Sequence, residues 1–420
     1  MAAKTGYAGP PAKRRKKNTP VRRNYPHRTE MQKISKEQER KKKRQQAGAR
    51  YADYSMILVV LFLLAIGLIM LYSTSSYEAA LEHADGAYYL KRQLLFTLIG
   101  LVVMVICTFL PFRLWKKTAY LLFGFSIMLI LLIIPFGREV NGAKRWLYFG
   151  PVSVQPAEIS KLAVIVLTAK ILTDIPKKKL RKWHTLILVL IPAIIQAGMI
   201  YFITDNMSSA IIVAAIGAGM LFVVIRDYWR YFLIGGGVAA AGGAWIYHVM
   251  HSDSDLGFRS QRILVWLDPE KYADGKGFQV LQGLYGIGSG GIFGKGLGNS
   301  MQKLGYIPEA QNDMIFSIIC EELGVFGAAS IIALFLILSW RLLIIANNAE
   351  DLFGGLVTVG VLLQIAVQVI LNIAVVTNTI PNTGVSLPFI SYGGSSVIIL
   401  LAEIGITMSV ARNIRLRELK

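Results

Sequence analysis

The chain has 420 residues, of which 54% are hydrophobic and 17% are charged, and its mean hydropathy is +0.50. These values exclude an ordinary water-soluble enzyme, because a soluble chain of this length would divide into domains joined by polar linkers. Most of the net charge of +20 lies in the first 50 residues, which carry 17 Lys or Arg against three acids.

The first 50 residues are predicted to form a disordered cytoplasmic tail. KRRKK at 13–17 and RKKKR at 40–44 stand among few apolar residues, so the segment cannot bury enough surface to fold alone. The first apolar run begins after Tyr54 and is long enough to span a membrane, which favours a retained tail over a cleaved signal peptide. We expect the tail to contact anionic lipid. It lacks the interleaved aromatic residues of RNA-binding segments, so no nucleic-acid partner is predicted.

Ten apolar stretches of about 20 residues predict ten transmembrane helices. They lie near residues 55–74, 92–110, 118–136, 156–173, 184–203, 207–225, 231–250, 314–339, 352–376 and 391–411. With the tail inside, fifteen basic residues fall in the inner connections and five in the short outer ones, so both termini are predicted to be cytoplasmic. The predicted fold is an all-α polytopic membrane protein, with the ten helices in a domain over 51–412 and a short basic end at 413–420.

Two of these spans are less clearly marked than the others. The turn TDN at 204–206 is very short, and the seventh span contains the run GGGVAAAGGA at 235–244. Small residues let helices approach closely, so we expect this run to serve helix packing.

No metal site is predicted from cysteine or histidine. Cys107 and Cys320 both lie in apolar stretches, which supports neither a disulfide framework nor a thiolate site. His248 and His251 share a helix face, with Asp253 and Asp255 nearby, but histidines at a membrane rim are expected to be interfacial.

The outer connection at 137–155 leads into a charged helix start. In KRWLYFGPVSVQPAEISK (144–161), Pro156 suits the first position of a helix and Glu158 lies in its first turn. Lys161 follows on the same face. An isolated charge there costs about 2.5–3.5 kcal/mol, so two interpretations stay open: an ion pair that orients the helix, or a polar cavity that admits a charged head group.

The large outer loop, 251–313, supplies Arg259 and Arg262 and is rich in glycine. Its glycines include a G-x-G-x-x-G match at 286–291, but no preceding strand or βαβ unit exists to make a nucleotide site. They are expected to allow tight turns or a close approach of the backbone to a ligand.

Acidic residues close this loop and continue into the next span. Asp313 precedes the apolar run MIFSIIC, where it could cap the helix or act on a ligand. Glu321 and Glu322 lie eight and nine residues further on, about 12–14 Å along the helix axis. Acids at that depth are functional candidates, although they could pair with basic groups such as Lys161.

The run NTGVSLPFISYGGSS at 382–396 predicts a bent polar re-entry near the outer surface.

Three separated strings, RWLYFGPVSVQPAEISK, GLGNSMQKLGYIPEAQNDMIFSIICEELG and NTGVSLPFISYGGSS, resemble the SEDS family, the peptidoglycan glycosyltransferases of the FtsW, RodA and SpoVE type. The resemblance runs from about 55 to 412, and QKLGYIPEA looks closest to the FtsW and SpoVE branch. It implies polymerisation of lipid II into β-1,4 glycan on the outer face of the bacterial cytoplasmic membrane, in septal or spore wall synthesis. The implied partners are lipid II and nascent glycan, a class B penicillin-binding protein acting as transpeptidase, and membrane proteins of the divisome or elongasome.

The resemblance also assigns roles to residues. The family's proposed catalytic acid falls on Asp313. Its other functional positions fall on Arg145, Glu158, Lys161, Arg259, Arg262, Lys303, Glu321 and Glu322. The chain departs from the family pattern twice: Asn312 stands where Thr is usual, and the turn at 204–207 lacks the usual Pro-Asp-Leu.

An α-linked sugar diphosphate that becomes a β-1,4 linkage is inverted in one displacement, so one general base suffices, and Asp313 is the candidate. The charge of the leaving diphosphate would be offset by Arg145, Arg259, Arg262 or Lys303, or by an Mg²⁺ or Mn²⁺ held by the diphosphate and Asp313. No organic cofactor is implied. Two other functions stay open: a transporter that flips lipid II, and a non-enzymatic scaffold for the transpeptidase.

Overall fold

The computed structural model describes residues 53–140, 142–150, 152–176, 183–225, 228–250 and 258–414. The predicted tail at 1–50 lies outside the described residues, as do His251, Asp253, Asp255 and the chain end from 415 onward.

All ten predicted spans are helices. They are α2 (Tyr54–His83), α3 (Tyr88–Phe109), α4 (Arg113–Phe136), α5 (Pro156–Asp174), α6 (Trp183–Thr204), α7 (Met207–Val224), α8 (Tyr228–Met250), α11 (Ile315–Asn347), α12 (Leu352–Val376) and α13 (Gly394–Ala411). Within the described residues, nine of them are long and apolar enough to cross a membrane, and α5 is the exception. A helix satisfies its own backbone, which is what a segment surrounded by hydrocarbon requires. The protein is therefore a polytopic all-α membrane protein.

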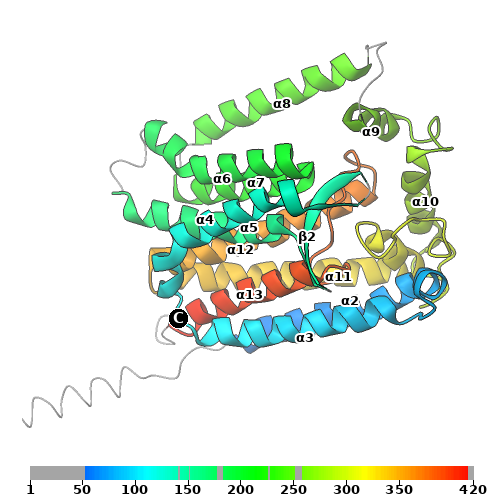
Figure 1. The fold of residues 1–420 in the computed structure, drawn as a ribbon, viewed down its shortest axis with the longest axis horizontal. Helices are drawn as coiled ribbons and strands as arrows, with labels where there is room; N and C mark the ends of the chain where they lie inside the picture. Colours follow the sequence, from blue (N-terminus) through cyan, green and yellow to red (C-terminus); the bar gives the residue numbers. More distant parts are fainter. Residues whose placement is uncertain are drawn as a thin grey trace, which may run out of the picture. The chain divides into compact units, whose positions relative to one another are not determined.

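Helix α5 differs because it is a central helix. It carries four charged side chains within 19 residues, and yet most of its residues are buried. In Figure 1, α5 lies among α4, α7, α12 and α13, and it contacts each of these helices. Its two buried charges, Glu158 and Lys161, thus face protein rather than lipid, where an ionised group would be costly, whereas Asp174 at the end of the helix is about half exposed.

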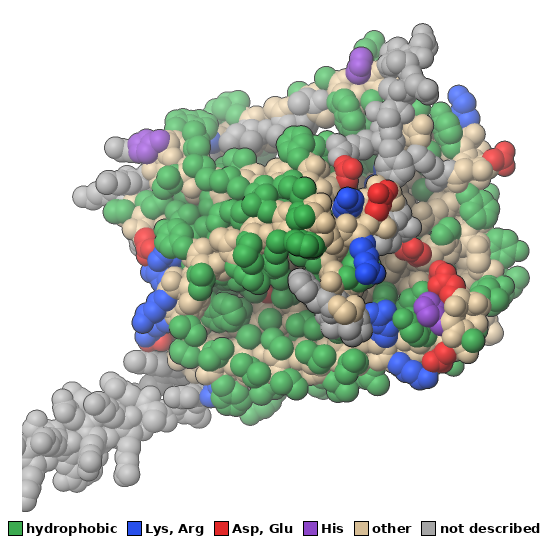
Figure 2. Space-filling model, in the orientation of Figure 1, with side chains coloured by type: hydrophobic (Ala, Val, Ile, Leu, Met, Phe, Trp, Pro, Cys, Tyr) green, Lys and Arg blue, Asp and Glu red, His purple; other side chains and the backbone are tan. Residues whose placement is uncertain are grey.

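The outer surface of the helices is apolar. Figure 2 shows hydrophobic side chains over the middle of one face, whereas charged side chains gather toward its two ends. Large side chains such as Leu98, Leu121 and Ile134 are more than half exposed. An exposed apolar surface of this extent suits contact with lipid.

Helix α8 corrects one expectation. It contacts α9 (Phe258–Leu267), and its first turn reaches α6 and α7, where Arg230 lies over the ring of Trp183 and Tyr231 packs edge-on against Phe222. Beyond that turn, α8 runs apart from α6 and α7 in Figure 1. At Gly235, Gly236 and Gly237, a Cβ atom would meet no described heavy atom within 4 Å. The packing expected of this glycine run is therefore wrong for the described part of the single chain, because no other helix of the bundle reaches it.

The connections at one end of the bundle form structure of their own. A three-stranded antiparallel sheet, β1 (Arg138–Val140), β2 (Ala143–Phe149) and β3 (Val152–Val154), fills the connection between α4 and α5. The large loop contains α9 and α10 (Lys276–Ser289). We call this end, with the sheet, α9, α10 and residues 377–393, the loop end; it lies at the right of Figure 1.

Helix α11 is broken at Gly324, and the break explains several glycines of the large loop. Gly324 has φ 67° and ψ −166°, which is not helical. The amides of Lys295 and Gly296 donate to the carbonyls of Glu321 and Glu322, at 2.9 and 3.0 Å. On the other side of the break, the amides of Val325 and Phe326 donate to the carbonyls of Gly291 and Ile292, at 3.0 and 3.1 Å. Loop backbone thus supplies the partners that the broken helix lacks. The loop glycines lie against α11, and their expected close approach to a ligand stays a prediction.

Replacing Gly324 by Ala is expected to destabilise the protein by at least about 2 kcal/mol, because its φ and ψ lie in a region that is nearly restricted to glycine. A Cβ atom at this position would also lie within 3.0 Å of the backbone of Ile292 and Gly294. The thermal midpoint of the purified protein measures the effect. Gly124→Ala in α4 is the control, since a Cβ atom there meets nothing within 4 Å. Equal midpoints for the two variants would contradict a required break.

Candidate active site

Asp313 lies where two loops of the loop end are joined. The buried side chain of Asn372, near the end of α12, donates to the carbonyl of Asp313 at 2.8 Å and to that of Val385 at 2.7 Å. The amide of Tyr392 donates to the carbonyl of Gln311 at 2.9 Å. These bonds tie the end of the large loop to residues 377–393, and the bent re-entry expected at 382–396 is an irregular segment that enters α13 at Gly394.

The carboxylate of Asp313 has the properties of a base. Residue Asp313 keeps part of its surface open, but its carboxyl is crowded, and this burial raises its pKa to about 6. The nearby carboxylate of Glu309 raises the pKa further, and the guanidinium of Arg262 opposes the shift. Helix α11 has Met314 at its N-cap and no side-chain cap bond, so Asp313 does not cap it. A carboxyl that titrates near neutral pH suits proton transfer.

Arg262 is the cation whose charge acts on the carboxyl of Asp313 and lowers its pKa. It lies on α9, and its Nη1 donates to the carbonyl of Asn382 at 3.1 Å. Asn382 in turn accepts the amide of Gly384, and a Cβ atom at Gly384 would lie 3.6 Å from Oδ2 of Asp313. Arg259 lies one turn earlier on α9, and its side chain is outside the described part of the structure.

Arg145 is connected to Asp313 indirectly, through the turn that departs from the family pattern. Its Nη2 donates to the carbonyl of Asp205 at 2.9 Å, and burial lowers its pKa, which the Asp205 carboxylate opposes. Three residues after Asp205, the hydroxyl of Ser208 donates to the carbonyl of Thr383 at 2.5 Å, next to Gly384. The Nε of Arg145 is buried without a hydrogen-bond partner, so this guanidinium retains capacity for an anion.

Glu158 and Lys161 form a buried ion pair inside the bundle. The Lys161 Nζ lies 2.8 Å from Oε1 of Glu158, and the two side chains are 1% and 6% exposed. Ser396 of α13 also donates to Glu158, at 3.1 Å. A second buried acid, Glu403 of α13, accepts from Gln364 of α12 at 3.0 Å. These five residues on three helices make a polar cluster, which extends from the start of α5 to the middle of α12 and α13.

Glu321, Glu322 and Lys303 hold the large loop on α11. The Nζ of Lys303 lies 2.8 Å from Oε1 of Glu322 and donates to the hydroxyl of Ser73 at 3.0 Å. Glu321 accepts from the side chain of Lys295 at 2.7 Å, from the hydroxyl of Ser300 and from the amide of Met301. The two acids therefore pair with loop lysines, whereas Lys161 pairs with Glu158.

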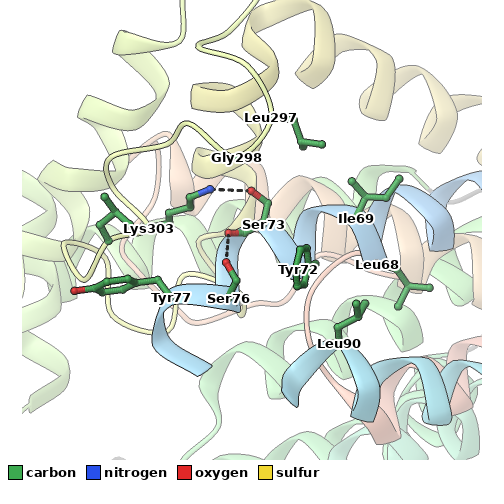
Figure 3. Close-up of a pocket in the computed structure, with 11 residues that line it drawn as sticks. Leu68, Ile69, Tyr72, Ser73, Ser76, Tyr77, Leu90, Leu297, Gly298 and Lys303 are labelled. Atoms are coloured by element: carbon green, nitrogen blue, oxygen red, sulfur yellow. Dashed lines mark hydrogen bonds between the residues drawn. The ribbon is translucent and has the colours of Figure 1, made fainter. Parts of the chain in front are cut away.

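Lys303 also lies in the wall of a cavity of about 690 Å³ beside α2. In Figure 3 its ammonium points toward Ser73, and the other residues that line the cavity include the apolar side chains of Leu68, Ile69, Leu90 and Leu297. Because Lys303 is already paired with Glu322, it is less able to bind a further anion than Arg145 is.

The predicted site residues therefore fall into three groups. Asp313, Arg262 and, through the turn, Arg145 meet at the loop end. Glu158 and Lys161 lie in the bundle, and Lys303, Glu321 and Glu322 fasten the loop. Sequence reasoning missed Asn372, Gln364 and Glu403. The spacing of polar residues at 364, 368 and 372, one helix face within an apolar span, was a signal for the α12 residues.

Metal ligands are sparse. Where the structure describes the chain, no group of three or more His, Cys, Asp or Glu could hold a metal ion. Glu309 lies near enough to raise the pKa of Asp313, so the site offers two carboxylates. That donor set fits Mg²⁺ or Mn²⁺ only with further oxygens from a bound phosphate, which is how Mg²⁺ is commonly held.

The chain is similar to known proteins over all of its membrane-spanning helices. Residues 54–416 match the FtsW/RodA/SpoVE family, described as cell cycle protein. The chain is 38% identical to a probable peptidoglycan glycosyltransferase FtsW of Trichlorobacter lovleyi over 88% of this chain and 96% of the relative. It is 37% identical to stage V sporulation protein E of Bacillus subtilis, over 86% and 97%.

Two solved structures are also similar. One is described as structural coordination of polymerization and crosslinking by a peptidoglycan synthase complex, with a TM-score of 0.70 and 29% identity over 87% of this chain and 99% of the matched chain. The other is Thermus thermophilus rod shape determining protein RodA, with a TM-score of 0.62 and 26% identity over 87% and 98%.

Proposed function

This chain belongs to the FtsW, RodA and SpoVE family of cell cycle proteins, and we propose that it polymerises lipid II into β-1,4-linked glycan. The chain is a glycosyltransferase, as its similarity to relatives named peptidoglycan glycosyltransferase indicates. The observation that carries the substrate and mechanism is Asp313, whose crowded carboxyl has a raised pKa and interacts electrostatically with Arg262.

In the proposed mechanism, Asp313 accepts the proton of the acceptor 4-hydroxyl. The hydroxyl oxygen forms a bond to the anomeric carbon, and the bond from that carbon to the diphosphate breaks, so the configuration is inverted. Charge develops on the leaving diphosphate, and fixed cations in a partly dry site stabilise it. Arg262 and Arg145 are the best placed for this role, and Arg259 remains a candidate. Lys303 ranks below them because it is paired with Glu322.

Asp313 is the residue that would hold a divalent cation, and the cation would supply charge stabilisation to the leaving group. Glu309 is the second carboxylate that the cation could recruit.

We place the enzyme in the bacterial cytoplasmic membrane with both termini inside and the loop end outside. The positive-inside distribution of Lys and Arg supports this orientation. A class B penicillin-binding protein is the proposed transpeptidase partner, alongside other divisome or elongasome membrane proteins. A solved synthase complex that couples polymerization to crosslinking supports a partner of that kind. Similarity to FtsW and SpoVE favours division or spore wall synthesis.

The test is glycan formation from labelled lipid II by the purified protein, with and without its transpeptidase. Polymer in either reaction supports the transferase. A flippase would move lipid II across a vesicle membrane without forming polymer, and a scaffold would do neither. The buried Glu158–Lys161 pair is the feature that a flippase would use for a head group, but both charges are already satisfied by each other.

The pH dependence should follow Asp313. A general base acts in its ionised form, which predominates above its pKa of about 6. The polymerisation rate should therefore reach a plateau above that pH and fall about tenfold per unit below it. Glu309→Gln should move the midpoint to lower pH, because it removes a carboxylate that raises the pKa of Asp313. Initial rates between about pH 4.5 and 8 measure this, and a profile without a midpoint would contradict it.

A further inference from the structure

A second cavity, of about 250 Å³, lies at the loop end between α9, α10 and residues 377–383. Its walls include Arg262 and Trp266 of α9, Phe278 and Gln279 of α10, and Asn378 and Asn382. Two neighbouring helices of the large loop and a segment about a hundred residues further along the chain thus line one space.

Hydrogen bonds hold these walls in place. The indole Nε1 of Trp266 donates to the carbonyl of Asn378 at 3.0 Å, and Nδ2 of Asn378 donates back to the carbonyl of Trp266 at 3.2 Å. Arg262 donates to the carbonyl of Asn382 at 3.1 Å. Asn378 has φ 53°, a left-handed conformation that Asn tolerates better than most residues. The cavity is therefore largely preformed, which lowers the entropic cost of binding.

The chemistry of the walls matches an uncharged sugar. Two aromatic rings, Trp266 and Phe278, offer apolar faces against which the C–H face of a pyranose can pack. Amide groups on Gln279, Asn378 and Asn382 can pair with hydroxyl and acetamido groups, since each amide both donates and accepts. None of the residues that line the cavity is an acid, and its one cation, Arg262, is the residue assigned above to the leaving diphosphate, so the rings and amides remain for the sugar.

The size and position of the cavity restrict which part of the substrate it could bind. Its volume is below the roughly 300 Å³ at which pockets for drug-sized ligands begin, so it has room for one sugar ring. It also adjoins Asp313. Asn382 lies two residues before Gly384, whose Cβ position is 3.6 Å from the Asp313 carboxylate, and Pro308 of the wall lies five residues before Asp313.

We propose that this cavity binds the N-acetylhexosamine ring that carries the acceptor hydroxyl, and that Phe278 and Gln279 contribute to its affinity. The inference rests on the proposed function, because it places one substrate of that reaction. It adds the residues that select the acceptor to those that carry out the transfer.

The test compares Phe278→Ala and Gln279→Leu with wild type in lipid II polymerisation. Phe278 is 37% exposed, so its removal leaves the core intact. Each variant should raise KM about tenfold with kcat within about threefold, because a binding contact is lost and the base is retained. Soluble tri-N-acetylchitotriose should inhibit wild type competitively, and its inhibition constant should rise in parallel in both variants. Phe293→Ala is the matched control, since Phe293 is 80% exposed and outside this cavity.

The outcomes separate the two proposals. An unchanged KM in both variants, while wild type polymerises lipid II, overturns the sugar site alone. A fall in kcat at constant KM also overturns it, because the residues would then act by positioning Asp313. No polymer from wild type with its partner present would overturn the proposed function itself. Thermal midpoints within a few degrees of wild type establish that the variants are folded.

Discussion

Asp313→Asn is expected to lower the rate of glycan polymerisation by at least about 100-fold, the usual contribution of a positioned general base. Asparagine keeps the size of the side chain, and the bond from Asn372 goes to the backbone carbonyl of residue 313, so the two loops should stay joined. The amide cannot accept a proton at neutral pH. Initial rates with labelled lipid II and the thermal midpoint of each protein together separate a chemical effect from an unfolding effect.

Asp274→Asn is the matched control for this variant. Asp274 is an exposed acid of the same large loop, in the connection between α9 and α10, and it should be replaceable with no change in rate. Polymerisation at the wild-type rate by Asp313→Asn would exclude Asp313 as the base. Loss of activity in both variants would indicate a general effect of loop charge.

The second large effect is a loss of stability, which we expect from Lys161→Met. Lys161 is 1% exposed, and its removal leaves the buried carboxylate of Glu158 with Ser396 as its hydrogen-bonding neighbour. Removing one partner of a buried pair typically costs about 3–5 kcal/mol, because the remaining charge is desolvated without compensation. The thermal midpoint in detergent should therefore fall sharply.

Two further variants make this result specific. The double variant Glu158→Gln with Lys161→Met should be more stable than Lys161→Met alone, since it removes both charges. Lys91→Met breaks an ion pair of the same length, 2.8 Å, but with a lysine that is 69% exposed, and it should leave the midpoint almost unchanged. If Lys161→Met and Lys91→Met had equal midpoints, the Glu158–Lys161 pair would not support the bundle.

The helices could be predicted from the sequence because each apolar run has the length of a span, and all ten are present. The sheet at Arg138–Val154 could not, since its strands of three to seven residues are too short for a periodicity to be read. Helix α8 was placed correctly, but its glycine run does not show which surface, if any, it contacts.

At the candidate site, Asp313 stood out because an acid ends a loop before an apolar run. Asn372 did not, because the polar series at 364, 368 and 372 marks one face of α12 but gives no indication of a partner 59 residues earlier in the chain. Glu321 and Glu322 were recognised as buried acids, but their lysine partners depend on the break at Gly324. That break brings Lys295 back onto α11, and a single glycine in an apolar helix does not predict it.

The backbone hydrogen bonds between α11 and residues 291–296 have a consequence for insertion of the chain into the membrane during synthesis. A helix broken at Gly324 and carrying two acids is a poor segment to insert into lipid alone, because its open backbone groups and carboxylates would lack partners. Residues 291–303 leave the ribosome before α11 does, so these partners already exist when α11 enters the membrane. The direction of synthesis thus assists assembly, and a circularly permuted chain in which α11 came first would have to insert it unsatisfied.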